Sequence, residues 1–186
     1  TDITGGAGND SVDFDATLNV LDKYDGGAGI DTVELNGMGF TATSVVGGLS
    51  NVEVLKLISA HTITLEGNIS PTTFDFTNET AQVLNLLDGY TNPTTVKLAG
   101  DASNTDKVIN TANVALTVST NPLSYDSGTT ITGGTGTDTI NVVNTAAGTV
   151  DFAQTTNVDA INFVDFTPGV DVTLDLQSYT LDSTFY

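Results

Sequence analysis

The sequence predicts an all-β protein, and three features support this fold class. Apolar residues occur in short runs that alternate with polar residues, as in half-buried strands. Glycine, asparagine, aspartate and threonine separate these runs, which is typical of turns between strands. Helical spacing of apolar residues is hard to find, and 39% of the 186 residues are hydrophobic, which is enough to form a core of packed strands.

The clearest alternation occurs in five segments, which we expect to be strands. They are residues 31–35, 52–57, 94–98, 139–143 and 170–176. One further segment, 78–87, is open between a short helix and a strand, because Asn78 is a suitable helix N-cap. In a helix, Ala81, Leu84 and Leu87 would share one face.

An internal repeat relates the two halves of the chain. Segments 26–33, 51–57 and 63–66 match segments 133–140, 157–163 and 172–175, at offsets of 107, 106 and 109 residues. Three matches at nearly one offset predict two related β lobes, residues 1–105 and 106–186. Because no long linker separates them, one continuous β stack is at least as good an interpretation.

The charge of the chain limits its partners. Asp and Glu number 23 against four Lys and Arg, for a formal net charge of −19. Nucleic acid and anionic membrane surfaces are therefore unsuitable partners, since little in the chain would displace counterions from phosphates. No run of about 18 apolar residues is present, so membrane insertion is not expected. A cation is the natural partner.

The chain has no cysteine, so disulfides and thiolate metal sites do not contribute to its stability. An exported protein without disulfides needs another way to hold its loops, and bound calcium supplies one. The N-terminus, Thr1-Asp2-Ile3-Thr4, does not resemble a signal peptide. It is typical of a segment cut from a longer chain, or of a processed mature protein.

Three glycine loops share the form G-G-x-G-x-D-[ST]-[VI], at residues 5–12, 26–33 and 133–140. Calcium takes about six to eight oxygen ligands from carboxylates and backbone carbonyls. Glycine allows a loop to bend through positive φ, so that successive carbonyls can face one ion. The aspartate supplies charge, and the apolar residue two positions later begins a strand. The loops therefore predict calcium sites.

This motif resembles the calcium-binding nonapeptide of the RTX (repeats-in-toxin) family. The resemblance implies a calcium-binding parallel β-roll, a β-solenoid-like stack of short strands with Ca²⁺ between the loops of successive turns. The first two loops are 21 residues apart, whereas two ideal nonapeptides would span about 18, so we expect a bulged turn between them. The expected metal-ligating residues are Gly6, Gly8, Asp10, Asp25, Gly27, Gly29, Asp31, Gly134, Gly136 and Asp138.

The third loop has no second glycine loop near it in the sequence. We expect its partner oxygens to come from Asp126 or from a turn of the first half.

The composition also resembles that of large bacterial surface-layer (S-layer) proteins and RTX adhesins, which are similarly acidic and rich in Thr, Asn and Gly. The resemblance implies secretion to the bacterial cell surface and folding outside the cell. It implies a structural segment of an S-layer protein that self-associates with copies of the parent protein in a lattice. A ligand-binding or spacer domain of a large RTX adhesin is the alternative.

Catalytic patterns are missing from the sequence. His61 is the only histidine, and neither an H-E-x-x-H nor a G-x-S-x-G motif occurs. Tryptophan, a common platform for sugars, is absent. We therefore do not expect the chain to be an enzyme.

Overall fold

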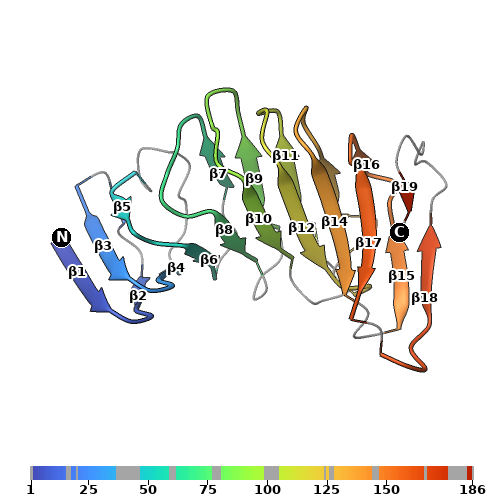
Figure 1. Ribbon diagram of the computed structural model, residues 1–186, viewed down its shortest axis with the longest axis horizontal. Helices are drawn as coiled ribbons and strands as arrows, with labels where there is room; N and C mark the ends of the chain where they lie inside the picture. Colours follow the sequence, from blue (N-terminus) through green and yellow to red (C-terminus); the bar gives the residue numbers. More distant parts are fainter. Residues whose placement is uncertain are drawn as a thin grey trace.

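The protein is a parallel β-solenoid, as the sequence predicts. The computed structural model describes residues 2–15, 18–19, 21–36, 47–58, 62–76, 81–98, 105–123, 125, 128–143, 147–165, 167–175 and 184–185. These residues form strands and turns and contain no helix. The strands pair in parallel, and successive turns of the chain stack along the long axis of the molecule (Figure 1). The expected all-β class and the stacked parallel architecture are confirmed.

Two long sheets run along the stack. The nine-stranded sheet contains β2 (Ser11–Phe14), β4 (Thr32–Leu35), β6 (Val54–Leu57), β8 (Thr73–Asp75), β10 (Thr94–Lys97), β12 (Leu116–Thr120), β14 (Asp138–Val143), β17 (Ala160–Val164) and β19 (Thr184–Phe185). The five-stranded sheet contains β7 (Thr62–Leu65), β9 (Val83–Leu86), β11 (Lys107–Asn110), β13 (Thr130–Thr132) and β16 (Thr155–Thr156).

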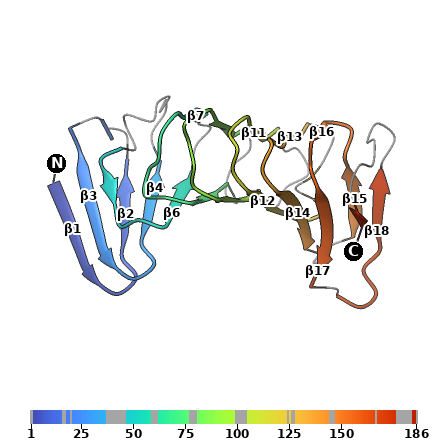
Figure 2. The same cartoon turned by 45° about the horizontal axis from the view of Figure 1, so that its top comes forward.

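Two short sheets lie toward the ends of the stack (Figure 2). One contains β1 (Asp2–Ala7), β3 (Lys23–Ala28) and β5 (Leu49–Ser50), and the other contains β15 (Gly148–Asp151) and β18 (Val172–Asp175).

All five segments that were expected to be strands contain one, namely β4, β6, β10, β14 and β18. The segment that was open between helix and strand contains β9, so the strand interpretation is correct for Val83–Leu86. Residues 77–80, at the start of that segment, lie outside the described residues.

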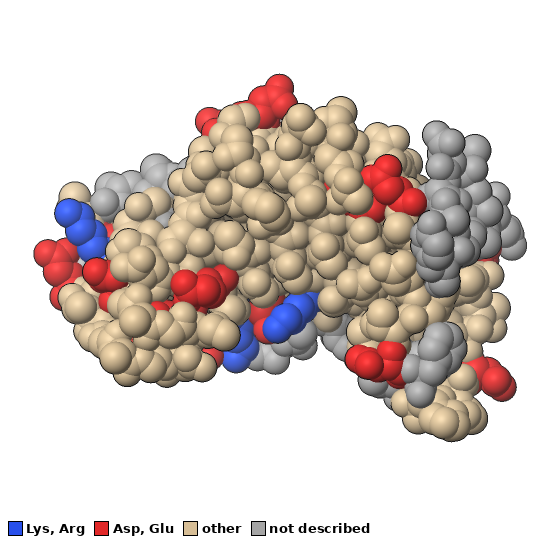
Figure 3. Space-filling model, in the orientation of Figure 1, with Lys and Arg blue, Asp and Glu red and all other residues tan. Residues whose placement is uncertain are grey.

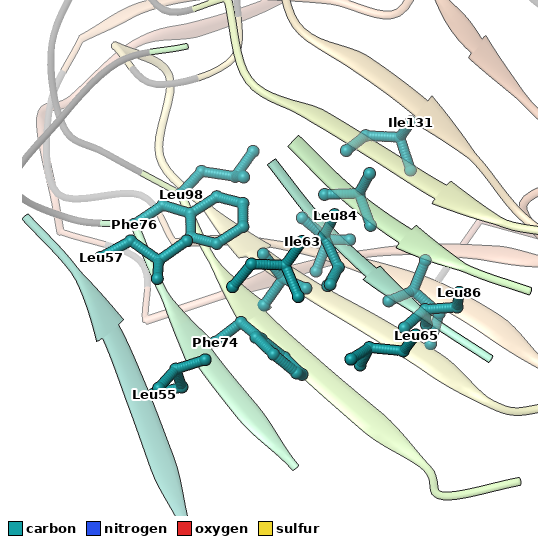
Figure 4. Close-up of a cluster of buried hydrophobic side chains, with 14 of the residues drawn as sticks. Leu55, Leu57, Ile63, Leu65, Phe74, Phe76, Leu84, Leu86, Leu98 and Ile131 are labelled. Atoms are coloured by element: carbon teal, nitrogen blue, oxygen red, sulfur yellow. The ribbon is translucent and has the colours of Figure 1, made fainter. Parts of the chain in front are cut away.

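The core lies between the sheets and follows from the alternation of side chains in each strand. Leu55 and Leu57 of β6 are fully buried, whereas Val54 and Lys56 are only half-buried. The parallel register places Leu55 beside Phe74 of β8, so equivalent positions of successive turns pack on one another. Figure 4 shows such side chains pointing toward one another between the strands. Each contributes about 1.5–3 kcal/mol by burial.

Both long sheets continue across residues 105 and 106. On one side β9 pairs with β11, and on the other β10 pairs with β12. The internal repeat has a structural counterpart, because Asn51 and Asn157 both adopt a left-handed conformation, with φ of 49° and 54°. Each precedes a strand of the nine-stranded sheet. No helix within the described part of the chain is long and apolar enough to cross a membrane.

Candidate metal centre

The first two glycine loops lie directly beside each other (Figure 2). The parallel pairing of β1 with β3 aligns Gly6 with Gly27 and Ala7 with Ala28. The N–H of Gly8 donates a hydrogen bond of 2.7 Å to the carbonyl of Ala28. The spacing of 21 residues between the loops therefore corresponds to one complete turn of the solenoid.

Close stacking explains the second and third glycines of the second loop, Gly27 and Gly29. A Cβ on Gly27 would overlap the carbonyl oxygen of Gly6, and a Cβ on Gly29 would overlap that of Gly8. Both glycines also have positive φ, of 97° and 144°, which side chains other than glycine rarely tolerate. The glycines therefore let one turn approach the carbonyls of the turn before it.

The acidic residues of the first turns form a ladder of hydrogen bonds, which we call the acidic ladder and define as Asp10, Asp31 and Glu53. The N–H of Asp10 donates to Asp31 Oδ1 at 2.7 Å, and the N–H of Asp31 donates to Glu53 Oε2 at 2.7 Å. Asp10 Oδ2 in turn accepts from the N–H of Gly6 at 2.9 Å. Each acid thus satisfies a backbone donor of the preceding turn or of its own loop.

Asp31 is the member of the ladder that best fits a cation. Its side chain is fully buried, yet Oδ2 has no hydrogen-bond partner. A Cβ on Gly26 would lie 2.6 Å from that oxygen and would overlap the carbonyl oxygen of Asn51. Both oxygens therefore pack directly against Gly26, at a position where only glycine fits. A buried carboxylate oxygen without a partner is costly, and a cation would satisfy it.

Asp25, the further expected ligand, directly precedes Gly26. Its Oδ1 accepts a hydrogen bond of 2.7 Å from the side-chain amide of Asn51. Asn51 therefore contacts Asp25 through its side-chain amide and Gly26 through its carbonyl oxygen.

The third loop uses its aspartate differently. Asp138 is fully buried, and its Oδ1 accepts from the N–H of Leu116 at 3.0 Å and from Asn110 Nδ2 at 3.1 Å. Its Oδ2 accepts from the N–H of Gly134 at 2.7 Å. Burial raises the pKa of Asp138, although these three hydrogen bonds lower it. Because nitrogen donors satisfy both oxygens, this carboxylate fits a cation less well than that of Asp31.

The turns that flank the third loop both belong to the second half of the chain. On one side, Cβ atoms on Gly134 and Gly136 would overlap the carbonyl oxygens of Ala112 and Val114. On the other side, the N–H of Asp138 donates to Asp159 Oδ2 at 2.7 Å. Its neighbours are thus turns 110–116 and 157–159, and not a turn of the first half. Asp126 lies outside the described residues.

Four residues of this arrangement were not expected from the sequence to belong to the site. Glu53 and Asp159 are equivalent acceptors, and Asn51 and Asn157 are equivalent turn residues that place a carbonyl oxygen at the first glycine of a loop. The sequence feature that could have identified them is the N-V-[ED] segment. It begins 25 residues after the start of a glycine loop in the first half of the chain, and 24 residues after one in the second half.

Carboxylates alone do not form a metal site in the part of the chain that the structure describes. It contains no group of three or more His, Cys, Asp or Glu side chains that could hold an ion. A cation at the first two loops would therefore need backbone carbonyl oxygens, such as that of Asn51, in addition to Asp31. His61 lies outside the described residues.

An open hollow lies away from the loops, lined by Glu66, Leu87, Asp88 and Thr111. These residues follow the ends of β7, β9 and β11, so the hollow spans three successive turns. Among the described residues, this lining supplies two carboxylates and one hydroxyl and no basic group.

Comparison with known proteins adds no family assignment. No protein-family model matches the sequence, and the searches of curated proteins and of solved structures found no significant match. The function must therefore be argued from the loops and from the fold.

Proposed function

We propose that the chain is a structural, calcium-stabilised segment of a secreted bacterial cell-surface (S-layer) protein that assembles into a surface coat. The observation that carries the proposal is the stacked pair of glycine loops, residues 5–10 and 26–31, in which buried Asp31 keeps one carboxylate oxygen without a hydrogen-bond partner. A buried carboxylate oxygen of this kind, packed against Gly26 together with the carbonyl oxygen of Asn51, is a ligand type that Ca²⁺ prefers.

Asp10, Asp31 and the carbonyl of Asn51 are the residues that would hold the ion. Bound Ca²⁺ would neutralise carboxylate charge and link successive turns of the stack. Binding that favours the folded chain stabilises it by mass action, by about 2.7 kcal/mol when free calcium is a hundredfold above Kd. Such a chain would be most stable outside the cell, where calcium is abundant.

The surface charge supports the same role. Figure 3 shows acidic side chains at several places on one face and few basic ones, in keeping with a net charge of −19. Among the described residues, Lys56 lies in an ion pair with Glu34 at 3.2 Å. Copies of so acidic a chain repel one another, and divalent cations reduce that repulsion. Calcium would therefore support both the fold and the packing of copies.

The test is a calcium titration of chelator-treated protein, followed by circular dichroism and thermal melting, with magnesium as the competing ion. We compare the wild type with Asp31→Asn and with Asp171→Asn, a change at an exposed aspartate. Calcium should raise the melting temperature of the wild type and of Asp171→Asn more than magnesium does. Asp31→Asn should lose most of that rise.

Two results would count against the proposal. An equal calcium response in both variants would mean that calcium acts by general screening of the acidic surface. An unchanged melt of the wild type would mean that the glycine loops are turns without a metal.

A further inference from the structure

The outer face of the nine-stranded sheet carries a row of charged side chains. In β4, β6, β8 and β10, which lie next to one another in this sheet (Figure 1), every second side chain is buried and the others lie at the surface. The parallel register places one charged residue of each strand at an equivalent position of successive turns. We call these residues the charge row and define it as Glu34, Lys56, Asp75 and Lys97.

Charges of opposite sign alternate along this row. Its two acids and two lysines sum to zero, in a chain whose formal net charge is −19. The outward residues beside them in the same strands are uncharged: Thr32, Val54, Thr73 and Thr95. The charge row therefore marks a part of the surface that another copy of so acidic a chain can approach without net repulsion.

Contacts within the chain use only part of the row. Lys56 Nζ lies 3.2 Å from Glu34 Oε1, and both side chains remain about a quarter exposed. Lys97 is exposed, and it makes no ion pair with another described residue. Because an exposed ion pair stabilises a single chain little, an alternating row of charges contributes more to recognition than to stability.

The row is complementary to itself when a second copy faces it with the order of the turns reversed. A twofold axis parallel to the strands, between β6 and β8, produces this arrangement. It places Lys56 of one copy opposite Asp75 of the other. It also places Lys97 of one copy opposite Glu34 of the other, and each pair occurs twice by symmetry. A twofold axis along the stack would instead place each residue of the row opposite itself, so that like charges would meet.

We infer that the outer face of the nine-stranded sheet, around the charge row, is a twofold contact surface for a second copy of this chain. The inference rests on the proposed coat function and names a contact through which copies would join. Six strands of each copy, β2 to β12, would face each other at a strand spacing of about 4.8 Å. At both ends of this contact Asp13 would face Ser119, whose hydroxyl can donate to the carboxylate. A contact this small is weak by itself and suits one of several contacts in a lattice.

Paired cysteine variants test the geometry of the contact. The chain has no cysteine of its own, and Thr32 and Thr95 lie beside the charge row without belonging to it. The twofold places Thr32 of one copy opposite Thr95 of the other, whereas β6 and β8 separate these residues within one chain. Under mild oxidation in calcium, an equimolar mixture of Thr32→Cys and Thr95→Cys should give several times more disulfide-linked dimer than either variant alone. Equal yields from the mixture and from the separate variants would overturn the inference.

Charge reversal tests whether the row carries the contact. Lys97→Glu should raise the dissociation constant for self-association in calcium about tenfold, because it places carboxylates opposite each other. Sedimentation velocity measures this constant, and circular dichroism checks that each variant folds. Lys107→Glu is the matched control, since Lys107 is also exposed but lies in the five-stranded sheet.

A double reversal separates the contact between copies from effects within one chain. Glu34→Lys combined with Lys97→Glu keeps the net charge at −19 and restores opposite charges across the twofold, so association should recover. Within one chain the two positions are too far apart to form a pair, because β6 and β8 lie between them. Equal association of Lys97→Glu and Lys107→Glu, or no recovery in the double variant, would overturn the inference.

Failure of the inference is distinguishable from failure of the proposed function. If calcium raises the melting temperature but the mixed cysteine variants give no excess of dimer, the twofold contact is overturned and the calcium-stabilised segment stands alone. If the mixture gives the expected dimer although calcium leaves the melt unchanged, the contact stands and the role of calcium is overturned.

Discussion

The aspartate of one motif occupies two different environments in this chain. In the third loop, three nitrogen donors satisfy both oxygens of buried Asp138. In the second loop, Asp31 is equally buried but keeps one oxygen without a hydrogen bond. A buried carboxylate is tolerated only when its oxygens find partners. The two loops should therefore respond differently to the same substitution and to a cation.

Replacing Asp138 by asparagine should destabilise the fold without calcium. An amide has one acceptor oxygen, so its NH₂ group would face an N–H donor of Gly134 or Leu116. Leaving a buried donor unsatisfied costs about 1–3 kcal/mol, and we expect the free energy of unfolding to fall by that amount. Chemical denaturation in chelator measures it. Asp171→Asn is the control, and an equal loss in both variants would show that the hydrogen bonds of Asp138 contribute little.

At this scale the sequence predicted the loop aspartates and glycines but not their partners. Asp10, Asp31 and Asp138 follow from the motif alone. The roles of Asn110 and Glu53 depend on which turn stacks on which loop, and that register cannot be obtained from a local pattern. The motif also does not distinguish a carboxylate that nitrogen donors satisfy from one with a free oxygen.

The turns of the solenoid are linked through the backbone of the glycine loops. Gly27 sits on the carbonyl of Gly6, and the same relation joins the third loop to the turn before it. Alternation of apolar residues predicted the strands correctly, because it depends on local geometry. It did not predict their parallel stacking, which came from the glycine motif. Nor did it distinguish helix from strand at 78–87. There the structure contains the strand β9, in which alternate side chains are buried in the core.

Alanine at position 27 should cost more than alanine at position 6, although both are the second glycine of the same motif. Gly27 has a φ of 97°, a conformation that costs a residue with a Cβ about 1–2 kcal/mol. Its Cβ would also overlap the carbonyl of Gly6, whereas a Cβ on Gly6 meets open space. Dilute, monomeric Gly27→Ala should therefore melt well below the wild type, and Gly6→Ala should melt close to it. Equal melting temperatures would contradict the stacking role of the second loop.

The whole molecule behaves as a nearly one-dimensional stack, in which each turn contacts chiefly its neighbours. Central strands such as β10 pair on both sides, with β8 and β12. Within the part of the chain that the structure describes, β1 and β2 pair on one side only, with β3 and β4, and their apolar residues Ile3 and Val12 are only partly buried. Local stability should therefore fall from the centre of the stack toward its ends.

Native-state hydrogen exchange should show this gradient directly. In dilute protein, amides of Thr94–Lys97 should exchange most slowly, and those of Asp2–Ala7 and Ser11–Phe14 much faster. Uniform protection along the chain would mean that the stack unfolds as one unit, and the contrast between its centre and its ends would then have no energetic basis.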